Sequence, residues 1–370
     1  MSEVLLEKTA KPERLLSLDF FRGAVMFLLI GESAHIFFFV INPEAEGTFW
    51  HSLGMQFHHH PWNGLRMWDL IQPAFMFIVG VSMPMSFRSR TLRGDSYALI
   101  RKHAIQRAGL LLLLGWALYC IGPGHITWRF HNVLSQLSVT YLITFFLLKY
   151  SLRTQLIASL VILAVTELLY RAAGISGFDQ AFVADKNFGA YVDMLIAGEL
   201  NGGHWVVFNA LPTTAHTIWG AMVGVLLMSD RSKMEKLRIL VVAGLIGVGL
   251  GYLMDPMTPI IKRIATSSFV VVSGGWTLLA FALSYWIIDV LNMKKGVLFF
   301  TVVGMNPLFI YLFAHIGGAG LVRKVIKPFS GAVFDHIEFI PTEAATNLIV
   351  WFALWYMCYW MYKKKIFIRI

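Results

Sequence analysis

The stretch SSFVVVSGGWTLLAFALSYWII, residues 267–288, runs for 22 residues without a charged side chain. A helix rises about 1.5 Å per residue, so roughly 20 apolar residues cross the hydrocarbon core of a bilayer. Apolar runs of this kind recur along nearly the whole chain of 370 residues. The sequence therefore predicts an all-α protein that crosses a membrane many times.

Composition supports this class. Hydrophobic residues make up 57% of the chain and charged residues 14%, and the mean hydropathy is +0.65. An ordinary soluble domain carries about 25% charged residues. We expect one polytopic transmembrane domain over residues 1–370, with about ten transmembrane helices. The expected spans are 16–41, 64–87, 104–122, 133–149, 155–173, 204–228, 238–254, 266–291, 296–316 and 344–362.

The distribution of lysine and arginine predicts the orientation. With these spans, 21 of the 31 basic residues lie on the side of the termini, nine lie on the opposite side, and Arg22 falls inside the first span. The positive-inside rule then places both termini in the cytoplasm. The long loops 42–63, 174–203 and 317–343 fall on the outer side. This distribution accounts for the net charge of +10, so we expect no nucleic-acid partner.

Several ionisable side chains fall within the expected spans, where burying a charge is costly. They are Asp19, Arg22, Glu32, His35, Asp69, His216 and His315. Asp19 and Arg22 are three residues apart on one helix face, so they can form an ion pair. Such groups either hold helices together or face a functional cavity. For His216 we expect an interhelical hydrogen bond.

The motif HHHPWNG, residues 58–64, places three consecutive histidines at the expected outer mouth. A shared zinc ion is disfavoured, because consecutive side chains point in different directions. One imidazole can act as a general base, since its ordinary pKa lies near neutral pH. Polar residues at a membrane surface are the remaining alternative. The residues alone leave these interpretations open.

Four segments carry a resemblance to a known family: SLDFFRG (17–23), HHPWNGLRMWDLIQPAFMFIVG (59–80), GMNPLFIYLFAH (304–315) and YKKKIFIRI (362–370). Together they resemble the heparan-alpha-glucosaminide N-acetyltransferase family, including its bacterial DUF5009 or NagX-like members. The resemblance extends over essentially the whole chain and keeps the order of the segments. It implies that His59, three residues before Trp62, is catalytic, and it assigns no role to His58 or His60.

Some positions depart from the family pattern. The segment 129–136 keeps Arg129 but loses a glycine and a Gln-Arg pair. The segment 262–268 keeps Lys262 and Ser268, whereas Ala265 stands where tryptophan is usual, and Ser33 stands where asparagine is common. Because these positions lie on the outer side or within the spans, they can reshape the acceptor pocket. The sequence therefore predicts the class of reaction more firmly than it predicts which sugar is the acceptor.

The resemblance implies transfer of an acetyl group from cytosolic acetyl-CoA to the amine of an amino sugar, with terminal glucosamine as the expected acceptor. His59 would act as general base or carry the acetyl group as nucleophile, and Asn63 and Asp69 would orient or polarise its imidazole. We expect the donor to contact Arg22, Asp19, Arg129, Lys262 and Ser268. We expect the acceptor to contact Trp62, Glu32 and His315.

The expected setting is a bacterial inner membrane, with the active-site mouth facing the periplasm or exterior and the bilayer as partner. We expect no metal cofactor, and a homodimer is left open. Two alternatives remain: an amino-sugar transporter without covalent chemistry, and an inactive regulatory membrane protein. A transporter would need a site reachable from both faces and would not depend on acetyl-CoA.

Overall fold

The computed structural model describes residues 15–37, 46–337 and 341–368. Over these residues the fold is all-α, and the only β-type pairing found there is one isolated bridge. The all-α part of the predicted fold class is therefore confirmed. The described chain divides into two compact units. The first unit comprises residues 60–65 and 69–290, and the second comprises 15–37, 46–59, 66–68, 291–337 and 341–368.

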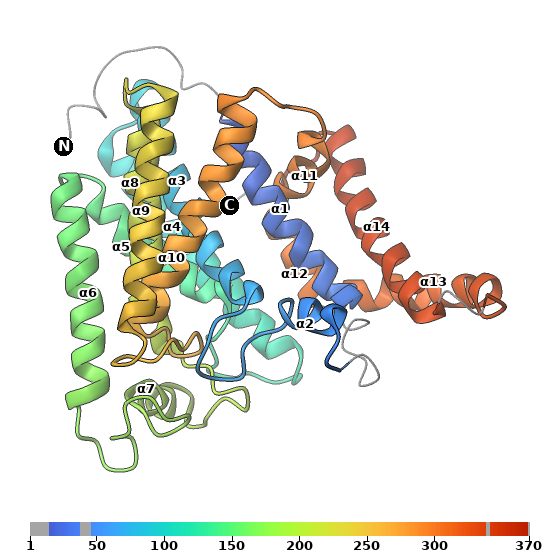
Figure 1. The fold of residues 1–370 in the computed structure, drawn as a ribbon, viewed down its shortest axis with the longest axis horizontal. Helices are drawn as coiled ribbons and strands as arrows, with labels where there is room; N and C mark the ends of the chain where they lie inside the picture. The colour runs from blue at the N-terminus through green and yellow to red at the C-terminus, as the bar shows by residue number, and fades with distance from the viewer. Residues whose placement is uncertain (1–14, 38–45, 338–340, 369–370) are drawn as a thin grey trace. The chain divides into compact units, whose positions relative to one another are not determined.

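The first unit contains seven of the longer helices and the short helix α7. In chain order they are α3 (Ile71–Leu92), α4 (Tyr97–Ile121), α5 (Val133–Leu147), α6 (Leu152–Ala172), α7 (Phe188–Ala197), α8 (Ala210–Met228), α9 (Lys233–Met254) and α10 (Ser267–Tyr285). The 3-10 turn η4 (Met67–Leu70) precedes α3, η5 (Val207–Asn209) precedes α8, and the π-helical turn η6 (Trp286–Val290) extends α10. Figure 1 shows α9 and α10 side by side, as their contacts require.

The second unit is built from helices at the two ends of the chain. They are α1 (Leu16–Ser33), α2 (Phe49–Met55), α11 (Val297–Gly304), α12 (Pro307–His315), α13 (Gly318–Phe334) and α14 (Thr342–Lys363). Residues 38–41 of the expected first span lie outside the described part. The indole Nε1 of Trp351 on α14 donates a hydrogen bond to the Phe27 carbonyl of α1 at 3.0 Å, which ties the two ends of the chain together.

Six helical segments in the described chain are long and apolar enough to cross a membrane. They are Met67–Leu92, Tyr97–Ile121, Leu152–Ala172, Val207–Met228, Lys233–Met254 and Ser267–Val290. The pair α11 and α12, bent by 68° at its break, becomes a seventh if it counts as one span. Each of the ten expected spans contains helix, but α5 has only 15 residues and α1 carries three charged side chains. The count of ten and the orientation of the termini therefore stay predictions.

The expected outer loops are partly helical. The segment 42–63 contains α2, 174–203 contains α7, and 317–343 contains α13. Helix α7 begins where the Asn187 side chain accepts the Ala190 N–H, and it ends at Gly198, whose φ of +72° suits glycine. A side-chain cap thus begins α7, and Thr48 caps α2 in the same way, whereas α13 begins without one.

Glycines set the distance between the packed helices of the first unit. On α8, Gly220 and Gly224 form a G-x-x-x-G pattern that faces Gly80 and Val81 of α3. A Cβ at Gly224 would lie 2.5 Å from the Val81 carbonyl oxygen. Small residues at this spacing let two helix backbones approach closely in a membrane, where packing drives helix association.

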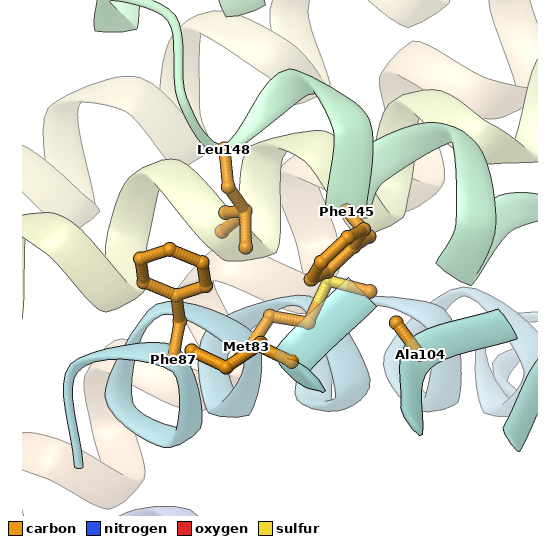
Figure 2. Packing of buried hydrophobic residues seen from close by; sticks show 7 residues of the cluster. Met83, Phe87, Ala104, Phe145 and Leu148 are labelled. Carbon is orange, nitrogen blue, oxygen red and sulfur yellow. The ribbon is translucent and has the colours of Figure 1, made fainter. Parts of the chain in front are cut away.

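A hydrophobic cluster joins the other ends of these helices (Figure 2). It comprises Met83, Phe87, Ile100, Ala104, Phe145, Leu148 and Ala221, contributed by α3, α4, α8 and the C-terminal end of α5. Every member is at most 7% exposed. The close packing of α3, α5 and α8 brings their N-terminal ends together at a polar site.

Candidate active site

A chain of buried amides connects the N-terminal ends of α3, α5 and α8. The Gln72 amide donates a hydrogen bond to Gln136, and Gln136 Nε2 donates to Asn209 Oδ1 at 2.6 Å. All three side chains are buried. Buried amides need hydrogen-bond partners, and here they find one another across three helices.

The segment 255–266 packs against these helix ends. Its Arg263 carbonyl accepts a hydrogen bond from Asn209 Nδ2 at 3.3 Å. The neighbouring Lys262 Nζ lies 3.6 Å from Asp69 Oδ1, and both residues are buried. We call Asp69, Gln72, Gln136, Asn209 and Lys262 the buried polar cluster. Ionisable groups buried among apolar helices are functional candidates by default, because their burial is costly.

Positive charge reaches the buried polar cluster from two sources. The N-terminal ends of α3, α5 and α8 meet there, and each helix carries a partial positive charge at its N-terminal end. The Lys262 ammonium adds a formal charge and lies 5.4 Å from the Trp205 ring. Burial lowers the pKa of the adjacent Arg263 guanidinium, with the Asp69 carboxylate acting in the opposite direction. The Asp69 carboxylate lies 3.6 Å from the Lys262 ammonium and balances its formal charge.

The histidine motif meets this site through its backbone. In the first unit, the His60 N–H donates to Asp69 Oδ2 at 3.2 Å. In the second unit, Arg66 Nη1 donates to the His59 carbonyl at 3.0 Å, and His58 Nε2 lies 3.3 Å from the Phe37 carbonyl. Each of these contacts lies within one unit, and the boundary between the units falls between His59 and His60.

The residues after the histidines are held by the same segment 255–266. Asn63 forms an antiparallel bridge with Ile261, and the Gly64 N–H donates to the Ile260 carbonyl at 2.8 Å. Gly64 has a φ of +143°, and a Cβ there would lie 2.6 Å from His60 Nε2. A residue with a Cβ would be strained at this positive φ, which favours glycine at position 64.

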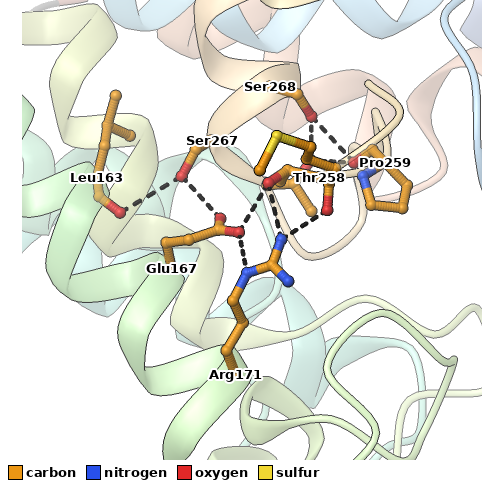
Figure 3. A network of polar contacts seen from close by, with 9 residues as sticks. Leu163, Glu167, Arg171, Thr258, Pro259, Ser267 and Ser268 are labelled. Atoms are coloured by element: carbon orange, nitrogen blue, oxygen red, sulfur yellow. Dashed lines mark hydrogen bonds and ion pairs between the residues drawn. The ribbon is translucent and has the colours of Figure 1, made fainter. Parts of the chain in front are cut away.

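A second polar network braces the segment 255–266 from the side of α6 (Figure 3). Glu167 accepts hydrogen bonds from Arg171 at 2.6 Å, from Thr258 at 2.7 Å and from Ser267 at 3.2 Å. The Ser268 hydroxyl donates to the Pro259 carbonyl at 3.0 Å. The structure thus places Ser268, expected at the donor, in a contact that stabilises the loop.

Two other predicted residues of the first unit lie in surface contacts. Arg129 Nε pairs with Glu199 Oε1 at 2.7 Å, and this hydrogen bond lowers the pKa of the Glu199 carboxyl. Trp62 Nε1 donates to the Phe182 carbonyl at 2.8 Å. These contacts hold the segments between the helices together and leave the expected roles at donor and acceptor as predictions.

The second unit holds the remaining predicted residues. The expected pair of Asp19 and Arg22 is present, with 3.3 Å between Oδ1 and Nη1. Glu32 Oε1 accepts from Trp68 Nε1 at 3.0 Å. His315 Nδ1 lies 2.9 Å from the Tyr311 carbonyl, one turn earlier on α12. Each residue therefore has a defined local partner within its own unit.

The interhelical hydrogen bond expected for His216 is confirmed. Its Nε2 on α8 lies 3.0 Å from both the Val270 carbonyl and the Ser273 hydroxyl of α10. Over the described ranges, no group of three or more histidine, cysteine, aspartate or glutamate residues is arranged to hold a metal ion.

Sequence reasoning missed the amide part of the site. Gln72, Gln136 and Asn209 were not among the expected site residues, although each is an amide at or near the start of an apolar run. Amides inside such runs were the available signal, because they need partners once buried.

Fold and site together define a class of protein: a helical membrane protein with a site of charged and amide side chains buried among its helices. The chain is 26% identical to human (Homo sapiens) heparan-alpha-glucosaminide N-acetyltransferase and 24% identical to the mouse (Mus musculus) protein of that name. Both alignments cover 98% of this chain and 61% of the relative, so the chain spans about three-fifths of the length of these relatives. No protein-family model matches the chain.

This chain is homologous to heparan-alpha-glucosaminide N-acetyltransferase, and the resemblance found in the sequence is confirmed. The finer assignment to bacterial DUF5009 or NagX-like proteins stays a prediction.

Proposed function

We propose that this protein is a membrane-embedded N-acetyltransferase that moves an acetyl group from acetyl-CoA to the amine of an amino sugar, with terminal glucosamine as the expected acceptor. Its homology to acetyltransferases supports the reaction class. The observation that carries the proposal is the contact of the His60 N–H with Asp69, which forms a buried pair with Lys262 in the first unit.

The reaction consists of three chemical events. The acceptor amine attacks the thioester carbonyl, a base removes the amine proton, and coenzyme A leaves as its thiolate. We propose that the neutral His59 imidazole is the base. If the reaction has two steps, His59 instead accepts the acetyl group first, as the nucleophile. Asp69 acts as a positioning residue, because it holds the peptide that follows His59. Lys262 is our candidate for stabilising the developing oxyanion.

We place the nucleotide end of the donor at the cytoplasmic side, near Arg22 and the basic segment 88–107. The acceptor then enters from the outer side, at the histidine motif. The proposed orientation is that of a bacterial inner-membrane protein whose site opens to the periplasm. The charge distribution of the loops supports it.

The test compares three single substitutions in purified protein with labelled acetyl-CoA and glucosamine. His59→Ala should lower transfer at least a hundredfold, as removal of a general base commonly does. His58→Ala and His60→Ala are the matched controls and should retain most of the activity. All three variants should remain thermally stabilised by coenzyme A, because His59 acts in the chemical step.

Two outcomes would contradict the proposal. Near-normal transfer by His59→Ala, with loss in His58→Ala or His60→Ala, would move the base to another histidine. A wild-type protein stabilised by free amino sugar but not by saturating coenzyme A would favour a transporter without covalent chemistry.

A further inference from the structure

Helix α13 exposes an apolar stripe that the proposed acetyl transfer does not use. Leu321, Val325, Phe329 and Val333 recur every fourth residue and are 62%, 67%, 72% and 58% exposed. At a spacing of 100° per residue, side chains four apart lie along one face of a helix. The stripe therefore runs the length of the helix.

The opposite face of α13 is held by α14. Ser330 is 3% exposed and shares a 2.6 Å hydrogen bond with the Thr346 hydroxyl. Arg323 donates hydrogen bonds to Asn347 and pairs with Glu343. Three polar side chains of α14 thus fix the rotation of α13, and the apolar stripe points away from its neighbour. Figure 1 shows α13 turned off the axis of α14 near the N-terminal end of that helix.

The third face of α13 is basic. Lys324 and Lys327 are exposed, and residues 318–334 include no acidic side chain. Positive charge beside an exposed apolar face is the pattern of helices that lie in the plane of a membrane surface. The apolar side chains enter the boundary of the acyl chains, while lysine ammonium groups reach the headgroup phosphates.

The position of α13 in the chain agrees with this placement. It begins at Gly318, three residues after the bent pair α11 and α12, which passes as one candidate span. The left-handed φ of +93° at Gly317 turns the chain at this point. At 17 residues with three basic side chains, α13 is too short and too charged to span a bilayer. If the bent pair is one span, α13 begins at the level of the membrane surface.

We propose that α13 is an interfacial anchor that docks its stripe of Leu321, Val325, Phe329 and Val333 into an anionic lipid surface, with Lys324 and Lys327 on the headgroups. The charge of the two lysines favours a lipid surface over a second copy of this chain as the partner of the stripe. A second copy of this stripe would offer the lysines no acidic partner on α13, whereas phosphates in an anionic leaflet neutralise them.

The test uses the full chain in nanodiscs of phosphatidylcholine, with or without phosphatidylglycerol. Phe329→Cys and Lys324→Cys, each in a background lacking Cys120 and Cys358, carry an environment-sensitive fluorophore. In anionic discs, the label at position 329 should be quenched several times more by a lipid with a shallow nitroxide than by an aqueous nitroxide. The label at position 324 should show the opposite preference.

Charge removal tests the lipid class. Each lysine near an anionic surface strengthens association about fivefold. The double variant Lys324→Gln with Lys327→Gln should therefore lower the ratio of chains with α13 docked on the lipid to chains with α13 free about 25-fold in anionic discs. Lys294→Gln with Lys295→Gln, an exposed pair outside α13, is the matched control and should leave it unchanged. In the unmodified chain, hydroxyl-radical oxidation of Phe329 should fall when phosphatidylglycerol is added.

Three results would overturn the proposal. Equal aqueous quenching at positions 324 and 329 would place the helix in water. Shielding of position 329 from both quenchers, with crosslinks between copies, would make the stripe a contact between two copies of this chain. Docking that is unchanged by phosphatidylglycerol and by the lysine variants would show that anionic lipid does not contribute to it.

Discussion

Replacing Gly224 with alanine should separate α8 from α3. The added Cβ would lie 2.5 Å from the Val81 carbonyl oxygen and 2.6 Å from Pro84 Cγ, both on α3. Ordinary van der Waals contact for a Cβ begins at 3.4 Å, so the two helices must move apart by 3.4 − 2.5, or about 0.9 Å. Neither a backbone carbonyl nor a proline ring can rotate out of the way.

Two opposing free-energy changes set the expected size of the effect. Overpacking a well-packed interface costs about 1–3 kcal/mol. Alanine is favoured over glycine inside a helix by about 1 kcal/mol, which offsets part of this cost. A matched control isolates the packing contribution: Gly249→Ala on α9 and Gly109→Ala on α4 add a Cβ that meets no atom within 4 Å. Gly224→Ala should therefore be about 1–3 kcal/mol less stable than either control.

Equilibrium unfolding of the purified protein in detergent, with denaturing detergent as titrant, measures the three variants against wild type. Acetyl transfer by Gly224→Ala should also fall, because α3 and α8 carry Gln72 and Asn209 of the buried polar cluster at their N-terminal ends. Equal or greater stability of Gly224→Ala relative to Gly249→Ala would refute the argument that glycine sets the distance between α3 and α8.

Three further predictions use other parts of the chain. Asn306→Ala removes two hydrogen bonds to residues 366–368, at 2.9 and 2.8 Å, so it should cost about 2 kcal/mol and speed amide exchange of that segment; unchanged exchange would contradict this. The pKa of Glu199 is lowered by Arg129, so stability from this pair is present above the unfolded pKa and lost as pH falls through the folded pKa. The thermal midpoints of wild type and Glu199→Gln should thus differ at pH 7 and converge in acid, and a constant difference would refute it. A reporter fused to the C-terminus should be cytoplasmic and one in the segment 174–203 external, and the reverse would overturn the orientation.

Part of the site was predictable because it depends on near neighbours in sequence. The pair of Asp19 and Arg22 follows from helix periodicity alone. His59 was identified through a resemblance that the homology now supports, while its catalytic role stays a prediction. Asp69 was singled out as an acid at membrane depth, and the structure places it in a buried ion pair.

The sequence by itself determined that this protein is helical and belongs in a membrane. A helix satisfies its own backbone hydrogen bonds, so an apolar run needs no distant partner to specify it. The number of spans was less secure, because α1 carries three charged side chains and α5 has only 15 residues. Short helices such as α13 were read as loop.

Only the tertiary structure decided which polar groups meet. Gln72 and Gln136 are 64 residues apart in sequence, and Gln136 and Asn209 are 73 apart. Their pairing depends on how α3, α5 and α8 pack. The G-x-x-x-G pattern of α8 indicates a close contact between helices, but the pattern does not say which helix it faces. The partner of Lys262 was undetermined for the same reason: its contact with Asp69 joins two segments that are distant in sequence and depends on the packing of the helices between them.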